Sequence, residues 1–271
     1  MQNGIHFISG LPRSGSTLLA ALLRQNPRFH AEMSSPVCPL YLQLQTGMSG
    51  KAEFHPFFDE ARRISMLRGL FTSYYSGTHE HKLVFDTSRA WCGKLSGLVK
   101  LFPSSKVICC VRATSWILDS IERLVQRNAY EPSRIFNFEA NGTVYSRVEM
   151  LTRPGGLVRA SYDNLREGFY GANATRLLLV TYESLAARPI QTLKTIYEFI
   201  NEPWFEHDAE HVEYSADEFD TKLGAPGLHR VSGKVQLVER PTILPPDIFE
   251  KFKDTAFWAD PKQNPYRVAV V

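Results

Sequence analysis

The sequence predicts a three-layer α/β/α fold in which helices cover both faces of a central parallel sheet. Four short apolar runs, each bounded by polar residues, are predicted to be buried strands, and segments with helical periodicity separate them. Strands that alternate with helices indicate βαβ units, whose parallel strands are covered on both faces. The expected strands are residues 5–9, 82–85, 106–111 and 176–182.

Three helices follow from the same pattern. The first begins near Ser16, directly after the first strand, and ends at about Gln25, where "NP" follows. The second runs from Thr114 to about Asn128 and carries apolar residues at helical spacing. The third covers about 189–200, after the fourth strand.

Helical insertions and a proline-rich tail fill the rest of the chain. We expect 33–80 to be aromatic and partly helical, and 129–175 to be a long helical insertion. The tail from Glu213 carries many prolines but also leucines, so we expect an ordered wrap of loops and short helices over the sheet edge. No linker or repeat interrupts the chain, and residues 1–271 are predicted to form a single domain.

The composition excludes several classes of protein. The 271 residues are 44% hydrophobic and 22% charged, which is typical of a globular protein. A net charge of +3 is too small for a broad nucleic-acid-binding face, so any anion site must be local. No secretory start is visible, and no stretch reaches the roughly 18 apolar residues of a membrane span.

The four cysteines form neither a disulfide framework nor a metal-ligand pattern. Cys109 and Cys110 are adjacent in an expected strand, where successive side chains point to opposite faces. We interpret all four as small buried thiols, and a reducing, cytoplasmic location is expected.

The loop after the first strand resembles a phosphate-binding loop with one residue changed. In "GLPRSGST", Gly10, Gly15 and Thr17 match the pattern G-x-x-x-x-G-K-[ST], but Ser16 stands where the lysine is expected. A cation, Arg13, lies within the loop instead. The fold class is therefore P-loop-like, with an altered anion site.

The residues of this loop are suited to binding an anion. The first N–H groups of a helix have no internal partner, and the helix dipole favours negative charge there. Ser14, Ser16 and Thr17 add hydroxyl donors, and Arg13 adds a permanent cation. Glycines at positions 10 and 15 let the backbone curl.

The missing lysine argues against nucleoside triphosphate chemistry, because that lysine reaches the β- and γ-phosphates. A nucleotide kinase or NTPase would also need a Mg²⁺-holding aspartate after an apolar strand. The third expected strand ends in Arg112, which has the wrong charge for a metal. A ligand that has a single 5′ anionic group and binds without a metal does not need that lysine.

Two motifs resemble the sulfotransferases that use 3′-phosphoadenosine 5′-phosphosulfate (PAPS). "PRSGSTLL" is similar to their 5′-phosphosulfate loop, with Arg13 before Ser-Gly. "KVICCVRATSWILDSIERL" is similar to their 3′-phosphate signature, an arginine at a strand end and a serine eight residues later. The resemblance implies that Ser14, Gly15, Ser16 and Thr17 bind the 5′ end, and that Arg112 and Ser120 hold the 3′-phosphate.

Further segments resemble the tyrosylprotein-type branch of this superfamily. "VTYESL" implies that Tyr182 contacts the nucleotide, and "FHAEMSSPVCPL" implies that Glu32 is the catalytic base. "LFPSSKVICCVR" is also similar to that branch. A third basic residue is expected one turn after the serine, and both Arg123 and Arg127 are near enough to supply it.

The segment "GLHRVSGKVQ" resembles the late loop with which this branch covers its cofactor. Arg230, Ser232 and Lys234 are the candidates for that cover. The segment is polar and flanked by glycines, as a mobile cover would be. An ordinary surface loop is the alternative.

The sequence departs from the family pattern after the second expected strand. Thr87 stands where the tyrosylprotein type carries a lysine, and Arg89 is the nearest cation. This leaves open which group stabilises charge at the transferring sulfuryl, and Arg13 could suffice. Asp86 could orient Arg13, bind the acceptor or cap the next helix.

The histidines predict no metal site. His207 and His211 are four residues apart, but no third ligand follows. His6 is expected to be a satisfied core group. His30 is a rival to Glu32 as the base, because it lies two residues away.

The combined expectation is sulfuryl transfer from PAPS to an acceptor hydroxyl, with 3′,5′-adenosine bisphosphate as the product and no metal. Glu32 would take the acceptor proton, and Arg13 with the loop would stabilise the developing charge. The branch suggests a phenol or a tyrosine, while sugars, lipids and small alcohols stay open. The alternatives are a non-catalytic protein that binds the nucleotide, and the kinase. The sequence does not specify an oligomeric state.

Overall fold

A central parallel sheet organises the computed structural model, which describes residues 4–50, 52–77, 82–137 and 142–271. Within these ranges the sheet has six strands in the order β2-β3-β1-β4-β5-β8, and every neighbouring pair is parallel. The predicted α/β/α fold with a parallel sheet is confirmed. The strands are β1 (Ile5–Gly10), β2 (Phe29–Ala31), β3 (Leu83–Thr87), β4 (Val107–Val111), β5 (Leu177–Thr181) and β8 (Ala269–Val270).

Strand β1 lies inside the sheet and pairs with β3 on one side and with β4 on the other. Ile8 is in register with Thr87, and Gly10 is in register with Cys110. The strand order therefore changes direction at β1. In open parallel sheets such a switch point, at the carboxyl ends of the strands, is where ligands bind.

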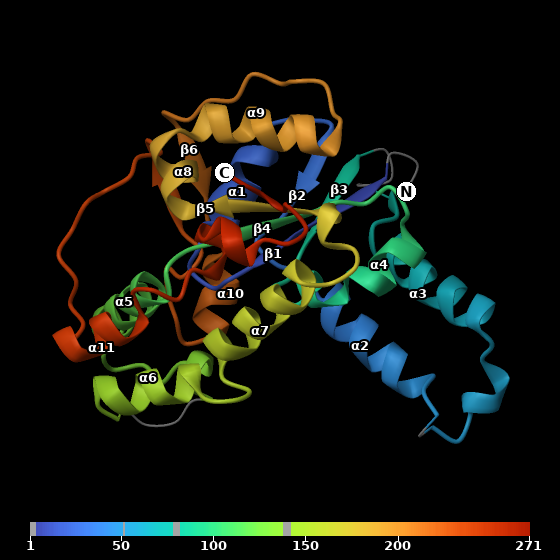
Figure 1. The fold of residues 1–271 in the computed structure, drawn as a ribbon, viewed down its shortest axis with the longest axis horizontal. Helices are drawn as coiled ribbons and strands as arrows, with labels where there is room; N and C mark the ends of the chain where they lie inside the picture. The colour runs from blue at the N-terminus through green and yellow to red at the C-terminus, as the bar shows by residue number, and fades with distance from the viewer. Residues whose placement is uncertain (1–3, 51, 78–81, 138–141) are drawn as a thin grey trace.

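Helices cover both faces of the sheet (Figure 1). One face packs against α1 (Ser16–Leu23) and α9 (Pro189–Ile200), whose buried leucines join the β-strand side chains. The opposite face packs against α4 (Leu95–Leu101), α5 (Thr114–Arg127) and α7 (Leu157–Phe169). These are the three layers that the alternating pattern predicts.

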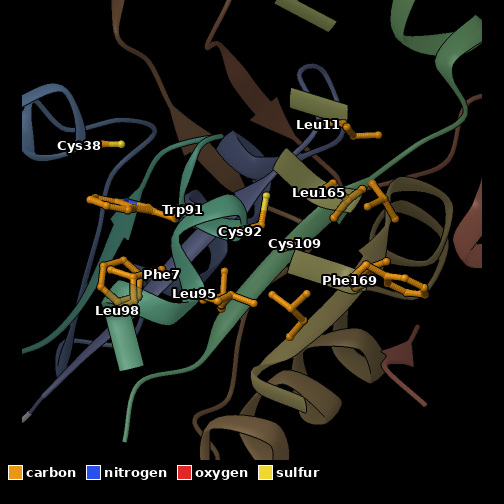
Figure 2. Packing of buried hydrophobic residues seen from close by; sticks show 14 of the residues in the cluster. Phe7, Leu11, Cys38, Trp91, Cys92, Leu95, Leu98, Cys109, Leu165 and Phe169 are labelled. Atoms are coloured by element: carbon orange, nitrogen blue, oxygen red, sulfur yellow. The ribbon is translucent and has the colours of Figure 1, made fainter. Parts of the chain in front are cut away.

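Two apolar cores result, one on each face. Cys109 belongs to one core and Cys110 to the other, as the alternation of strand side chains requires. Figure 2 shows the core that contains Cys109, where Phe7 packs on Trp91 with ring centroids 5.2 Å apart. All four cysteines are buried and free, which confirms their interpretation as buried thiols.

The insertions and the tail are helical where the sequence predicts helices. In Figure 1, α2 (Val37–Gly47) and α3 (Glu60–Tyr74) extend away from the sheet as one arm. The second insertion contains α6 (Val144–Thr152) together with α7. The tail contains α10 (Asp217–Lys222) and α11 (Pro246–Phe252), and it ends in β8 on the sheet edge.

The sequence analysis missed four short strands. They are β2, β8 and the antiparallel pair β6 (Val212–Tyr214) and β7 (Val231–Gly233). Strand ends were also wrong: β3 continues two residues beyond its expected end, and Tyr182 begins α8 (Tyr182–Ala187) rather than ending β5. The Thr181 side chain accepts a hydrogen bond from the Ser184 N–H, and this N-cap makes Tyr182 the first residue of the helix.

Short 3₁₀ helices connect several elements. They lie at His55–Phe57, Trp91–Lys94, Arg134–Phe136, Ala174–Arg176, Phe257–Ala259 and Pro261–Gln263. Among the described residues, no helix combines the length and the apolar character needed to cross a membrane.

Candidate active site

The predicted site residues gather at the carboxyl edge of the sheet. The loop 11–15 follows β1, Arg89 follows β3, Arg112 follows β4, and Tyr182 follows β5. Because these strands are parallel and adjacent, their ends lie side by side. Residues from four separate parts of the sequence are thus brought to one edge.

The backbone of the loop is fixed by close packing. Gly10 has φ of 110°, and a Cβ there would lie 2.1 Å from the Cys110 carbonyl oxygen of the neighbouring strand. Gly15 has φ of 95° and is the N-cap of α1. Arg13 also adopts a left-handed conformation, with φ of 56°, which is uncommon for a residue with a side chain.

The N-terminus of α1 is open toward this edge. No side chain caps it, so its first N–H groups have no side-chain partner there. Ser16 and Thr17 are the first two residues of the helix and are half-buried. The Ser14 hydroxyl instead donates to the Pro12 carbonyl at 3.2 Å and is buried, so it stabilises the loop itself.

Arg13 joins the loop to α5. Its Nε donates to Ser120 Oγ at 3.1 Å, and one terminal nitrogen donates to the Leu228 carbonyl oxygen at 2.5 Å. The sequence analysis assigned Arg13 and Ser120 to opposite ends of the nucleotide. The structure places them in direct contact, so the two predicted subsites adjoin.

Positive charge accumulates around Arg13. The pKa of Arg13 is lowered to about 10, first by burial and then by the nearby Arg127 and Arg112, while Tyr182 and Asp220 act in the opposite direction. Within the described chain Arg13 forms no salt bridge with a carboxylate. A buried cation without a carboxylate partner, with further cations nearby, favours the binding of an anion.

Arg112 lies against Tyr182. Its guanidinium carbon is 4.0 Å from the centroid of the tyrosine ring, and its Nε is 3.7 Å from Glu183 Oε1. The side chain is largely buried, and desolvation is the main cause that lowers the pKa of Arg112. The predicted residues Arg112 and Tyr182 are therefore brought together.

Several buried polar atoms at this edge have no hydrogen-bond partner. Arg112 Nε, Ser115 Oγ and Thr87 Oγ1 are three of the four such side-chain atoms in the described chain. Buried polar atoms are seldom left unpaired in a folded protein. Their position at the strand ends fits a site that an anionic, hydrogen-bonding ligand completes.

Glu32 lies at the end of the edge strand β2 and has two partners. Tyr214 Oη donates to Glu32 Oε2 at 2.8 Å, and the Arg24 guanidinium lies 3.3 Å from Glu32 Oε1. Burial raises the pKa of Tyr214 to about 12, and the bond to Glu32 acts in the same direction. The Glu32 side chain is 40% exposed, so an acceptor from solution can reach it.

The structure distinguishes the two candidates for the third basic residue. Arg123 is paired with the buried Asp119 at 3.0 Å and also donates to the Pro241 carbonyl. Arg127 lies near enough to Arg13 to lower its pKa. Arg127 is thus the one whose charge acts on the predicted site.

The predicted cover residues lie in β7 or directly beside it, and β7 pairs with β6 close to α1. Arg230, Ser232 and Lys234 are exposed, and Lys234 pairs with Glu210 at 3.0 Å. In the described part of the chain none of the three bonds to the loop. Their role as a cover stays a prediction.

Sequence reasoning missed two charged side chains near the site. Arg240 pairs with Asp119 at 3.0 Å and lies near enough to lower the pKa of Arg112. Asp220 is fully buried and bonds to His229. Neither belongs to a recognisable motif, because both lie in the tail outside the segments that resemble the family.

Two hypotheses about neighbouring residues have clear outcomes. Asp86 does not orient Arg13, because its carboxylate accepts hydrogen bonds from Ser35, Tyr75 and Trp91 inside the core. His6 is a satisfied core group as predicted, since its Nδ1 accepts from the Lys106 N–H at 3.0 Å.

The other histidines within the described ranges form no metal site. His207 is buried against Tyr197, with Nε2 and Oη 2.9 Å apart. No group of three or more potential metal-ligating side chains occurs among the described residues. A surface hollow of about 490 Å³ lies beside α9, but its lining contains none of the predicted site residues.

Comparison of the amino-acid sequence with known protein families gives a match. A profile of the sulfotransferase family covers residues 6–206, which is most of the chain. The chain belongs to the sulfotransferase family. The resemblance to this family that the sequence analysis described is thereby confirmed.

Two curated relatives are similar to the chain over most of its length. Protein-tyrosine sulfotransferase 1 of Danio rerio is 24% identical over 241 residues, covering 87% of this chain and 62% of that protein. Protein-tyrosine sulfotransferase 2 of Gallus gallus is 24% identical over 246 residues, covering 87% and 60%. The chain thus spans less than two thirds of their length.

Solved structures support the fold. The sulfotransferase domain from the curacin biosynthetic pathway matches with a TM-score of 0.52 and 20% identity, over 93% of this chain and 90% of that one. A sulfotransferase from Alicyclobacillus acidocaldarius matches with a TM-score of 0.52 and 15% identity, over 82% and 92%. At these identities the likeness concerns the fold alone.

Proposed function

We propose that this chain transfers a sulfuryl group from PAPS to an acceptor hydroxyl. The observation that carries the proposal is the group of Arg13, Arg112 and Arg127 around the uncapped start of α1. Arg13 has no carboxylate partner among the described residues, and the loop that carries it leads into a helix N-terminus, which already favours an anion. A nucleotide with separate 5′ and 3′ anionic groups matches that arrangement.

The chain's own residues divide between the two ends of such a nucleotide. The loop N–H groups with Ser16 and Thr17 would hold the 5′-phosphosulfate. Arg112, Ser120 and Arg127 would hold the 3′-phosphate, and Tyr182 would contact the nucleoside. Arg13 bonds to Ser120 and so adjoins both ends. When bound, PAPS supplies the activated sulfuryl group.

In the proposed reaction Glu32 takes the proton of the acceptor hydroxyl as that oxygen attacks sulfur. Its exposed carboxylate is held by Tyr214 and Arg24, which fix its orientation. Arg13 and the N–H groups of the loop stabilise the negative charge that develops on the departing phosphate. Arg89, two residues beyond the end of β3, is the cation nearest in sequence to the place of the missing lysine.

A phenol or a peptide tyrosine is the acceptor class we propose, because both curated relatives are named protein-tyrosine sulfotransferases. A second candidate function is non-catalytic binding of the nucleotide. The buried Thr87, which stands in place of the expected lysine, favours that alternative. A cytoplasmic location stays a prediction from the four free thiols.

Calorimetry tests the proposed binding chemistry. We expect 3′,5′-adenosine bisphosphate to bind without metal, and ATP with Mg²⁺ to bind far more weakly. The Arg112→Ala variant should lose about 30- to 100-fold in bisphosphate affinity, since it removes charge-assisted hydrogen bonds. Arg166→Ala is the matched control, because that arginine also lies over a tyrosine, 5.9 Å from the Tyr170 ring, on α7.

Each outcome separates the alternatives. Preference for ATP with Mg²⁺ would support a kinase and overturn the proposal. Tight bisphosphate binding that Arg112→Ala leaves unchanged would contradict the assignment of the 3′-phosphate site. Bisphosphate binding without any sulfuryl transfer would leave the non-catalytic binder as the function.

A further inference from the structure

A histidine and a buried aspartate form a pair beside Arg13. Asp220 of α10 is fully buried, and its Oδ1 lies 2.5 Å from His229 Nδ1. The other carboxylate oxygen accepts the backbone N–H of His229 at 2.8 Å. The carboxylate therefore fixes both the ring and its backbone, and it favours the tautomer with the proton on Nδ1.

The loop that carries His229 lies across α5 and the phosphate-binding loop. The carbonyl of Leu228, the preceding residue, accepts a hydrogen bond from Arg13. Asn128 at the end of α5 lies 3.4 Å from the Pro226 carbonyl oxygen. The imidazole is therefore held next to the cation that the proposed function assigns to the 5′ end of the nucleotide.

We propose that His229 is part of the anion site and that it gains a proton when the 5′ end of the nucleotide binds. The proton comes from solvent and adds to Nε2, while Nδ1 keeps its hydrogen bond to Asp220. The resulting imidazolium donates from Nε2 to an anionic oxygen of the ligand. No other bond is made or broken. This inference rests on the proposed function.

The charges around the ring explain why the proton is absent before the ligand arrives. Burial is the largest cause that lowers the pKa of His229, and the cations Arg13 and Arg89 lower it further. Asp220 acts in the opposite direction. The Phe219 ring packs against the imidazole and carries no charge. A bound anion would neutralise the two arginines, and the pKa of His229 would rise.

Proton uptake on binding measures this directly. The wild-type chain would be titrated with 3′,5′-adenosine bisphosphate at pH 7.5 in buffers of different ionisation enthalpy. The primary variant is His229→Asn, because an asparagine amide can keep the bond to Asp220 but has no Nε2 atom. We expect the wild type to take up about 0.3 to 1 proton more than the variant.

His211→Asn is the matched control. His211 also places Nδ1 near an aspartate, 3.0 Å from Asp208 Oδ2, but its side chain is 83% exposed. The control should take up as many protons as the wild type. Protons exchanged by the ligand's own phosphates are the same in every chain and cancel in the comparison.

The inference fails if wild type and His229→Asn bind the bisphosphate with equal proton uptake. A wild-type chain that does not bind the bisphosphate would instead overturn the proposed function. If His229→Asn does not fold, His229→Gln gives the same comparison. A further readout is the affinity between pH 6.5 and 8.5, which should weaken by up to about tenfold per pH unit in the wild type and less in the variant.

Discussion

Arg13 and Ser120, 107 positions apart in the chain, are joined by a hydrogen bond of 3.1 Å from Arg13 Nε to Ser120 Oγ. The bond connects the loop after β1 with α5. Each residue was predicted to hold a different phosphate of the nucleotide. Their contact means that the two proposed subsites adjoin, so we expect the effects of replacing the two residues to depend on each other.

The first prediction is energetic coupling between these two residues. Arg13→Ala and Ser120→Ala should each weaken binding of 3′,5′-adenosine bisphosphate. The double variant should lose less than the sum, with a coupling energy of about 1 kcal/mol. Calorimetric titration of the four chains measures it. Pairing Arg13→Ala with Ser146→Ala, on the exposed side of α6, should give additive effects. If the effects of Arg13→Ala and Ser120→Ala were also additive, the hydrogen bond between the two residues would play no part in binding the bisphosphate.

The second prediction concerns Glu32 and its partner. Glu32→Gln keeps the shape of the side chain but removes the base, so kcat should fall by about 100-fold or more while bisphosphate affinity stays unchanged. Tyr214→Phe removes the hydrogen bond to the carboxylate, and we expect a smaller loss in kcat of about 3- to 10-fold.

The chain offers a matched control for each of these variants. Glu202→Gln removes a carboxylate paired with Arg28 at 3.4 Å, and Tyr145→Phe removes a hydroxyl that donates to Asp247. Both should retain wild-type turnover. Normal turnover by Glu32→Gln would show that another group takes the proton.

The third prediction concerns the start of the loop. Gly10→Ala would place a Cβ 2.1 Å from the Cys110 carbonyl oxygen at a φ of 110°. Backbone cannot move aside as a flexible side chain can, so we expect a loss of about 3 kcal/mol or more in the free energy of unfolding. Gly155→Ala is the control, with φ of 80° but open space around it, and should cost only about 1 to 2 kcal/mol. Urea denaturation compares them, and equal losses would contradict the packing argument.

The fourth prediction concerns acid stability. Burial and the nearby Lys106 lower the pKa of His6 to about 4, from 6.5 in the unfolded chain. Between these values the unfolded state binds a proton that the folded state does not, so this contribution is present above pH 6.5 and is lost as the pH falls toward 4. The slope should reach about 1.4 kcal/mol per pH unit.

Denaturation of His6→Gln across the same pH range tests the source of that slope. We expect the variant to be less stable at pH 7 and to lose stability less steeply below pH 6.5. The exposed His211→Gln chain should follow the wild type. An unchanged slope in His6→Gln would assign the acid sensitivity to other groups.

The strands and helices with long apolar patterns could be predicted from the sequence. Helix α9 was placed at its observed bounds, and β4 was found within one residue. The missed strands are too short to show a period: β2 has three residues and β8 has two. Each forms because it pairs with a neighbouring strand, and not because its own residues favour a strand. That pairing can be seen only in the folded structure.

Some residues of the candidate site could likewise be predicted from the sequence, and others could not. Arg13, Arg112 and Ser120 belong to contiguous motifs, so their position at the sheet edge could be anticipated. The pair of Asp220 and His229 could not, because only His229 lies in a segment that resembles the family, and no sequence pattern links it to Asp220. The bond between Tyr214 and Glu32 spans 182 positions and depends on a strand that the sequence did not reveal.

The central claim is that this chain transfers a sulfuryl group, and transfer from radiolabelled PAPS measures it most directly. The chain would be incubated with labelled PAPS and a phenol, a tyrosine-containing peptide or a cell extract, without added metal. The account predicts label on an acceptor hydroxyl with the wild type and with Glu202→Gln, and almost none with Glu32→Gln. A chain that binds 3′,5′-adenosine bisphosphate tightly but labels no acceptor in any of these mixtures would contradict it.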